Sequence, residues 1–223
     1  MRLELYAHPF SSYCQKVLIA LREKQVDFTY LHLEEGDNGA RVKALWPIGK
    51  FPVLLADGAP IFETDAIVEY LDRRFPSPRL IPSGDDEAVE MRTMNSVFDS
   101  WVMQPMSAIV ATALRGEEIA TSPGVAAARA SLENAYSWLD ARLEGRSWAI
   151  GDAFTLADCT AAPALFYADW ANPIPAELAT LRGYSGRLLS RASIARAVDE
   201  GRPYRHYFPL DMPEPAEPLE RAG

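Results

Sequence analysis

Two adjacent serines and a cysteine, Ser11, Ser12 and Cys14, stand where a short apolar strand pattern gives way to a helical one. In a strand–helix–strand unit this is the position of a two-thiol C-x-x-C redox motif. Here a hydroxyl replaces the first thiol, so two-thiol exchange is lost. A hydroxyl beside the unpaired N–H groups and partial positive charge of a helix N-terminus can hold the thiolate of another molecule. The alternative is that the two serines only cap the helix.

Cys14 shares one helix face with Val17, Leu18 and Leu21. That face is the apolar one, so we expect the Cys14 thiol to be packed in the core. The alternative is a reactive Cys14, which would make the protein a thiol-transferase type.

The dipeptide Phe51-Pro52 opens a strand-like run. Proline removes a hydrogen-bond donor from a sheet, so its presence there needs a reason. A cis bond before Pro52 would leave the backbone of Phe51 open to pair with an incoming peptide. An ordinary trans proline at a sheet edge is the alternative.

The dipeptide Glu63-Thr64 begins a helix directly after a predicted hairpin. A helix N-terminus with a threonine hydroxyl is an anion site that suits a carboxylate, and Glu63 beside it would neutralise an ammonium. Together they match an α-amino-acid headgroup, in which both charges lie on one carbon. A capped helix with an acidic first turn is the alternative.

The elements that must position these residues alternate in the first part of the chain. The Asp57-Gly58 pair is the strongest hairpin signal in the sequence. The expected order is a strand around residues 3–5, a helix through Arg22, a strand at 28–33, a loop at 34–39 with a short helix through Leu45, strand-like runs at 51–56 and 60–62, and a helix at 64–75. A parallel crossover followed by an antiparallel hairpin predicts a mixed four-stranded sheet.

The rest of the chain lacks strand alternation. Prolines cluster in residues 76–86, which predicts a linker, and four prolines in 209–218 predict an extended tail. Thr155 to Asp158 is a capping-box pattern, which we interpret as structural. The helical patterns cover 88–115, 125–143, 155–170 and one or two helices in 177–198. The predicted division is a domain at 1–76, a linker at 77–86, an all-helical domain at 87–208 and a tail at 209–223, in the α+β class.

Composition limits the partners. The 223 residues include 22 Lys and Arg against 31 Asp and Glu, a formal charge of −9. Such a surface repels phosphate backbones and anionic membranes, so we expect neither nucleic-acid nor membrane binding. The two cysteines are too few for a disulfide framework, and the three histidines are scattered without the spacing of a zinc site. Without a signal peptide or a run of about 18 apolar residues, the expectation is a cytoplasmic protein without a metal.

These motifs, in this order, resemble the cytosolic glutathione S-transferase family over the chain up to about Pro209. The similar segments are SSYCQKV at 11–17, WPIGKFPVL at 46–54, ETDAIVEYL at 63–71 and FTLADCTAAP at 154–163. The opening SSYC is similar to the serine-type classes, particularly zeta-like and related bacterial enzymes. The resemblance implies a thioredoxin-like N-terminal domain with the mixed four-stranded sheet, an all-helical C-terminal domain, glutathione as cosubstrate and a homodimer.

The resemblance also implies roles for individual residues. Ser11 matches the hydroxyl that hydrogen-bonds the glutathione sulfur, with Ser12 as the neighbouring candidate. Lys50 matches a polar position and could pair with the glycyl carboxylate. Phe51 and cis-Pro52 match the main-chain clamp on the cysteinyl unit. Glu63 and Thr64 match the pair that holds the γ-glutamyl headgroup.

Two features depart from the family pattern. Trp46 stands where asparagine is commoner before the proline, and residues 36–45 fit the pattern poorly, so contacts from this segment with glutathione stay open. Asp99 lies where some classes send an acid across the dimer interface to the partner's glutathione.

The implied activity is conjugation of glutathione to a small apolar electrophile, a transferase reaction of detoxification. An apolar electrophile needs an apolar pocket, and the candidate walls are Phe10, Tyr13, Trp101, Met106, Phe166 and Trp170. Two other functions stay open. One is glutathione-dependent isomerisation or dehalogenation at the same site, and the other is a non-catalytic interaction module.

Overall fold

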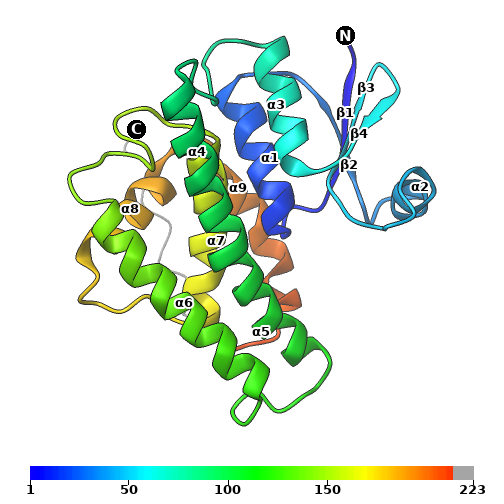
Figure 1. Ribbon diagram of the computed structural model, residues 1–223. Coiled ribbons are helices and arrows are strands. Elements are labelled where there is room, and N and C mark those ends of the chain that lie inside the picture. Colours follow the sequence, from blue (N-terminus) through cyan, green and yellow to red (C-terminus); the bar gives the residue numbers. More distant parts are fainter. Residues whose placement is uncertain (213–223) are drawn as a thin grey trace, which may run out of the picture.

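The computed structural model describes residues 1–212, and Figure 1 shows the order of its helices and strands. Residues 213–223, which make up most of the predicted tail at 209–223, lie outside the described residues. The described strands all precede Glu63, and the part that follows is helical.

The strands form one mixed sheet in the order β2 (Thr29–His32), β1 (Leu3–Ala7), β3 (Val53–Ala56) and β4 (Ala59–Ile61). β1 pairs parallel to β2 and antiparallel to β3. Asp57 and Gly58 form the hairpin turn between β3 and β4. Their φ values of 49° and 84° give the turn a twist that matches the twist of the strands. The predicted mixed four-stranded sheet is confirmed.

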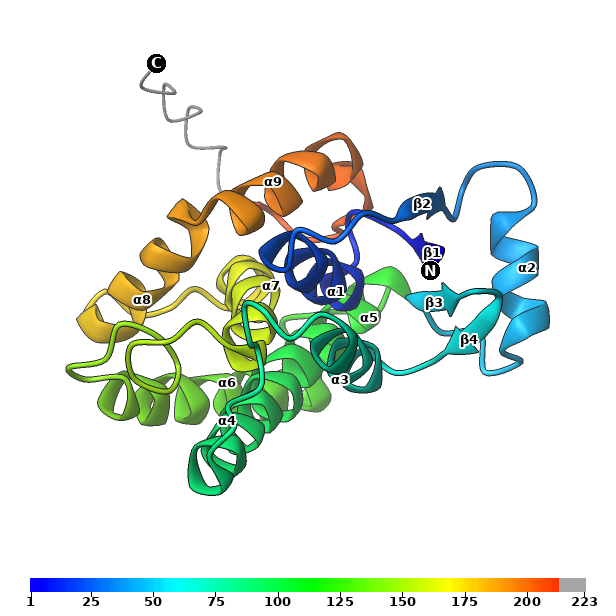
Figure 2. The ribbon, with the colours of Figure 1, turned by 90° about the horizontal axis from the view of Figure 1, so that it is seen from above.

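The two faces of the sheet carry separate apolar cores. Leu5 of β1 lies in the main core with residues of α1 (Ser12–Glu23) and α3 (Thr64–Arg74). The next residue, Tyr6, lies with Val42 of α2 (Asn38–Leu45) in a small second core. Figure 2 shows α1 and α3 on the side of the other helices, with α2 on the opposite side of the sheet.

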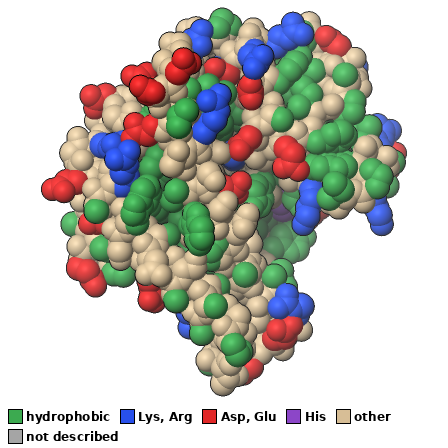
Figure 3. Space-filling model, viewed as in Figure 1, with side chains coloured by type: hydrophobic (Ala, Val, Ile, Leu, Met, Phe, Trp, Pro, Cys, Tyr) green, Lys and Arg blue, Asp and Glu red, His purple; other side chains and the backbone are tan. Residues whose placement is uncertain are grey.

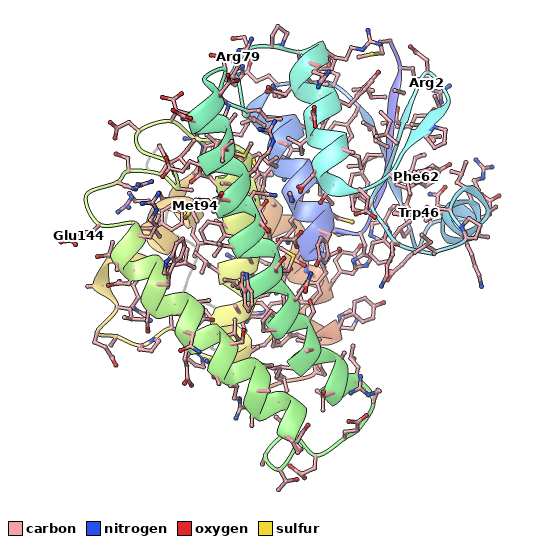
Figure 4. All side chains as sticks on the ribbon, in the orientation of Figure 1. Arg2, Trp46, Phe62, Arg79, Met94 and Glu144 are labelled. Atoms are coloured by element: carbon pink, nitrogen blue, oxygen red, sulfur yellow. The ribbon has the colours of Figure 1, made fainter. Side chains whose placement is uncertain are left out.

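Trp46, the residue that follows α2, packs against this small core. Its ring lies 4.6 Å from the ring of Phe62, centroid to centroid, and Figure 4 shows the two labelled side chains between α2 and β4. This contact accounts for a tryptophan at a position that departs from the resembled pattern.

The second part of the chain contains α4 (Asp85–Val97), α5 (Gln104–Leu114), α6 (Pro123–Arg142), α7 (Leu156–Ala171), α8 (Ala179–Ser190) and α9 (Ala192–Gly201). The sequence predicts one helix over 88–115. In the structure a π-helical segment, η1 (Phe98–Met103), separates α4 from α5. A 3-10 helix, η2 (Arg202–Tyr207), follows α9. No helix in the described part of the chain is both long and apolar enough to cross a membrane.

The central helix α7 packs against α1, α4 and η1, and the predicted capping box anchors its first turn. The Asp158 carboxylate accepts hydrogen bonds from the backbone N–H of Thr155 at 2.8 Å and from its hydroxyl at 3.0 Å. It also accepts from the N–H of Ala149 at 2.8 Å and the hydroxyl of Tyr184 at 2.7 Å. Asp158 is fully buried, so four donors from three segments depend on one carboxylate.

We predict that Asp158→Ala lowers the free energy of unfolding by about 3 kcal/mol or more, because it leaves buried donors unsatisfied. The measurement is urea denaturation. The control is Asp152→Ala, which removes an exposed carboxylate that accepts from Ser147 at 2.8 Å and should cost about 0.5 kcal/mol. Equal losses in the two variants would contradict the anchoring role.

Candidate active site

The sheet register brings the predicted site segments to one edge. β1 and β3 run antiparallel with Tyr6 opposite Val53, so the end of β1 lies beside the start of β3. β4 runs antiparallel to β3, so the end of β4 reaches the same edge. The turn that carries Ser11, the Phe51–Pro52 peptide and the first residue of α3 therefore converge there.

Ser11 occupies the turn between β1 and α1 and caps the helix. Its N–H donates to the carbonyl of His8 at 3.0 Å, and its hydroxyl oxygen accepts from the N–H of Cys14 at 3.3 Å. Ser12 is the first residue of α1. The capping contact uses a lone pair of Ser11, and a hydrogen bond of the same hydroxyl with the Cys14 side chain counters part of the rise in the pKa of that thiol. A ligand thiolate at this serine would take the hydroxyl hydrogen in place of the Cys14 sulfur.

Cys14 is fully buried, as the helix face predicted. Its sulfur accepts from the N–H of His8 at 3.3 Å, and burial raises the pKa of its thiol to about 12. A thiol with such a pKa stays protonated at neutral pH and is a poor nucleophile.

The peptide bond between Phe51 and Pro52 is cis, as predicted. Pro52 is buried, whereas Lys50 and Phe51 are exposed. This segment directly precedes β3, whose start lies beside the end of β1.

Glu63 and Thr64 form the start of α3. Glu63 has a φ of +66°, an unusual value for a residue with a side chain, and Thr64 is buried. The other described non-glycine residues with positive φ, Gln25 and Asp57, stand in turns after α1 and β3. An outlier at a helix start is typical of a functional site, where the fold holds a costly conformation.

The phenol of Tyr13 interacts with two carboxylates, Asp99 of η1 and Glu63. Burial raises the pKa of the Tyr13 phenol well above its ordinary value, and the charge of Asp99 and a hydrogen bond with it raise the pKa further, with a smaller effect from Glu63. One oxygen of Asp99, Oδ1, is buried without a partner among the described residues. Asp99 belongs to η1, so this π-helical turn places a carboxylate near Tyr13 of its own chain.

Three of the predicted pocket walls lie in one aromatic cluster. The rings of Phe166 and Trp170 are 4.6 Å apart and those of Phe10 and Trp170 are 6.4 Å apart, centroid to centroid. Met106 is buried in the core, whereas Trp101 is 59% exposed on η1. The cluster offers an apolar wall next to the Ser11 turn, because Phe10 directly precedes Ser11.

The surface is hollowed between the sheet-bearing part and the helices below it, as Figure 3 shows. Acidic side chains gather beside this hollow, and a histidine is visible at its base. The hollow gives a ligand access to the region between the two parts of the chain.

The structure corrects the expectation of scattered histidines. His8 Nε2 lies 3.1 Å from Glu34 Oε1, and the Tyr207 hydroxyl donates to the same oxygen at 2.8 Å. His32 is close, since its ring centroid lies 5.1 Å from that of His8. The parallel register pairs Ala7 with His32, which brings the ends of β1 and β2 together. The signal in the sequence was a histidine at the end of each of two strands predicted to be parallel.

Comparison with known proteins agrees with this geometry. The family model of the glutathione S-transferase N-terminal domain matches residues 5–79, and that of the C-terminal domain matches residues 122–187. The glutathione S-transferase-like protein LUC7 of a Fusarium species is 33% identical over 158 residues, which cover 69% of this chain and 71% of that protein. The probable maleylacetoacetate isomerase of Caenorhabditis elegans is 29% identical over 172 residues, 75% of this chain and 79% of that protein.

A solved structure shows the same fold with a ligand. The crystal structure of a glutathione S-transferase from Methylobacillus flagellatus KT with glutathione bound has a TM-score of 0.76 and 26% identity, and the match covers 87% of this chain and 98% of that one. The two domain matches together cover more than half of the chain, and the Fusarium relative is more than 30% identical over two thirds of it. The chain belongs to the glutathione S-transferase family.

Proposed function

We propose that this protein is a glutathione transferase that activates the glutathione thiol at Ser11 for attack on an apolar electrophile. The observation that carries the proposal is the Ser11 turn. The Ser11 hydroxyl stands at the N-terminus of α1, accepts the capping hydrogen bond from the Cys14 N–H, and would donate its hydrogen to a ligand thiolate in place of the Cys14 sulfur. The buried thiol of Cys14 leaves this hydroxyl as the group that meets the sulfur, with Ser12 next to it.

The energy needed for thiol activation is within reach of these groups. A free thiol has a pKa of about 8.5, and lowering it by about two units needs roughly 2.7 kcal/mol of selective thiolate stabilisation. A hydrogen bond to a charged group supplies about 1.5–3 kcal/mol, and the helix N-terminus adds about 0.3–1 kcal/mol. The thiol proton leaves to solvent, and the sulfur then bonds to the electrophilic carbon as the leaving group departs with the electron pair of its bond to that carbon.

The headgroup of glutathione fits the start of α3. The N–H groups and the Thr64 hydroxyl there would bind its carboxylate. The carboxylates of Glu63 and Asp99 would bind the ammonium of glutathione. Both carboxylates raise the pKa of Tyr13, so both interact with the same side chain. Lys50 would pair with the glycyl carboxylate, and the backbone of Phe51 beside cis-Pro52 would bind the cysteinyl unit.

The electrophile would lie against the cluster of Phe10, Phe166 and Trp170, between the domains at 1–76 and 87–208. Tyr13 and Trp101 would complete the proposed pocket, whereas Met106, another predicted wall, lies in the core. The proposed role of this reaction is detoxification of electrophiles, and the proposed location is the cytoplasm.

A second candidate is glutathione-dependent isomerisation or dehalogenation at the same site. The name of the Caenorhabditis elegans relative, a probable maleylacetoacetate isomerase, favours an isomerase. A non-catalytic interaction module is a weaker candidate, because such a module needs no strained Glu63 at a headgroup site. Retention on immobilised glutathione, followed by assays with a panel of electrophiles, separates these functions.

We predict that Ser11→Ala raises the pKa of bound glutathione by about one to two units, at roughly 1.4 kcal/mol per unit. Affinity for S-methylglutathione, whose sulfur carries no charge, should barely change. The measurement is an ultraviolet titration of the bound thiolate. Because Ser11 also caps α1, the control is Ser122→Ala, which removes the equivalent cap at Val125 of α6.

The Ser122→Ala variant should lose similar stability, about 0.5–2 kcal/mol, without a change in the titration. Cys14→Ala should leave conjugation nearly intact. An unmoved titration in Ser11→Ala together with an inactive Cys14→Ala would assign the chemistry to Cys14 instead.

We predict that Glu63→Gln weakens glutathione binding about tenfold or more, because a hydrogen bond to a charged group contributes about 1.5–3 kcal/mol. Calorimetric titration measures the affinity, and Glu87→Gln on the exposed side of α4 serves as the control. A glutathione analogue without the α-amino group should bind the variant and the original protein equally. Unchanged affinity for glutathione would remove Glu63 from the site.

We also propose a homodimer, as the family resemblance implies. Large apolar side chains on the helical part support it, since Val89 and Trp101 are 62% and 59% exposed. Analytical ultracentrifugation should give about twice the chain mass of 24.7 kDa. A species of 24.7 kDa at all concentrations would defeat the proposal.

A further inference from the structure

The cluster at the ends of β1 and β2 is built around one carboxylate. His8, His32 and Glu34 place side-chain nitrogen and oxygen atoms within 4.8 Å of one another. Glu34 Oε1 accepts a hydrogen bond from the Tyr207 hydroxyl at 2.8 Å and lies 3.1 Å from His8 Nε2. Both histidines are largely buried, whereas the Glu34 side chain is 46% exposed.

Backbone hydrogen bonds decide which nitrogen of each imidazole carries the proton. The N–H of Phe10 donates to His8 Nδ1 at 3.2 Å, and the N–H of Glu34 donates to His32 Nδ1 at 3.2 Å. Each Nδ1 therefore presents a lone pair, so each Nε2 of a neutral ring carries a hydrogen. Two Nε2 donors suit an anion. A metal ion would need the Nε2 lone pairs and would leave protonated Nδ1 atoms facing N–H groups.

One of these donors is unused. His32 is only 9% exposed, and its Nε2 is buried without a partner among the described residues. A buried donor without an acceptor is costly, so its persistence points to a ligand atom that completes the bond. The ring itself is held in place, because Tyr204 stacks on His32 at 5.3 Å and meets the edge of His8 at 4.7 Å, centroid to centroid.

The donors adjoin the thiol-activating turn. His8 lies three residues before Ser11, and the Ser11 N–H donates to the His8 carbonyl at 3.0 Å. Phe10, between them, belongs to the aromatic cluster with Trp170. A ligand with its apolar body against that cluster can therefore reach the donors with a polar end.

We propose that His8, His32 and Tyr207 form a subsite for the carboxylate of the electrophile, which Glu34 occupies when no such substrate is bound. The inference rests on the proposed function and narrows its substrate class to apolar electrophiles that carry a carboxylate. Glu34 is the replaceable member, because its side chain is exposed while the histidines are buried. In a chain of formal charge −9, neutral N–H and O–H donors supply the local attraction that a carboxylate substrate needs.

Two glutathione conjugates test the subsite. In the reaction of glutathione with 1-chloro-2,4-dinitrobenzene or 4-chloro-3,5-dinitrobenzoate, the thiolate sulfur bonds to the ring carbon and chloride leaves with the C–Cl electron pair. The two products differ in a nitro group's position and in one carboxylate. Calorimetry with the purified conjugates measures binding without requiring turnover.

His32→Phe keeps the stacked ring and removes the donor, and Tyr207→Phe removes the hydroxyl. Each should weaken binding of the conjugate with the ring carboxylate about tenfold, equivalent to about 1.4 kcal/mol, and leave the conjugate of 1-chloro-2,4-dinitrobenzene unaffected. Glu34→Gln should strengthen binding of the carboxylate conjugate. The controls are His206→Phe and Tyr70→Phe, which change an exposed histidine of η2 and a tyrosine of α3.

Four results would overturn the subsite. Equal weakening of both conjugates by His32→Phe and Tyr207→Phe would show a scaffolding role, and unchanged affinity for both conjugates in these variants would show no subsite. Stoichiometric zinc binding that His32→Phe abolishes would show that the Nε2 atoms are metal ligands. Failure of both conjugates and of glutathione to bind would overturn the proposed function as well.

Discussion

The site depends on the position of β1 between a parallel and an antiparallel neighbour. Its parallel pairing with β2 sets His8 beside His32, and its antiparallel pairing with β3 sets the Ser11 turn beside the Phe51–Pro52 peptide. Side chains of a strand alternate between faces, so a shift of one residue in either pairing would turn Leu5 out of the main core. Burial of β1 on both faces therefore fixes the geometry of the chemical groups at its end.

A second constraint joins the two parts of the chain. Lys16 of α1 is fully buried, and its ammonium lies 2.5 Å from Asp65 of α3. Asn95 of α4 donates to the other oxygen of Asp65 at 2.9 Å and accepts from the hydroxyl of Thr160 of α7 at 2.6 Å. A buried ammonium without its partners is strongly destabilising. This chain of contacts keeps α1, which carries Ser11, in register with the helices that carry Asp99 and the aromatic cluster.

Local patterns in the sequence predicted much of this arrangement. The Asp57-Gly58 turn, the capping box at Thr155 and the start of α3 each depend on a few neighbouring residues, and the structure has all three. The π-helical η1 escaped prediction because its apolar spacing resembles that of an α-helix, and packing decides the hydrogen-bond pattern. The pairing of His8 with His32 required the register of two strands far apart in sequence. The η2 contact of Tyr207 with Glu34 joins residues even farther apart, so no local signal exists for it.

The π-helical segment η1 adds one residue to the helical path between α4 and α5. A π-turn closes hydrogen bonds between residues five apart, so it holds one residue more than an α-turn. One residue of an α-helix corresponds to a rotation of about 100°. The π-turn absorbs this extra residue, so removing one residue from Phe98–Met103 would restore a continuous α-helix and leave the side chains of α5 close to their present directions. Among related chains, a one-residue gap at this position would therefore mark the loss of the turn that carries Asp99, while the α5 side chains keep their directions.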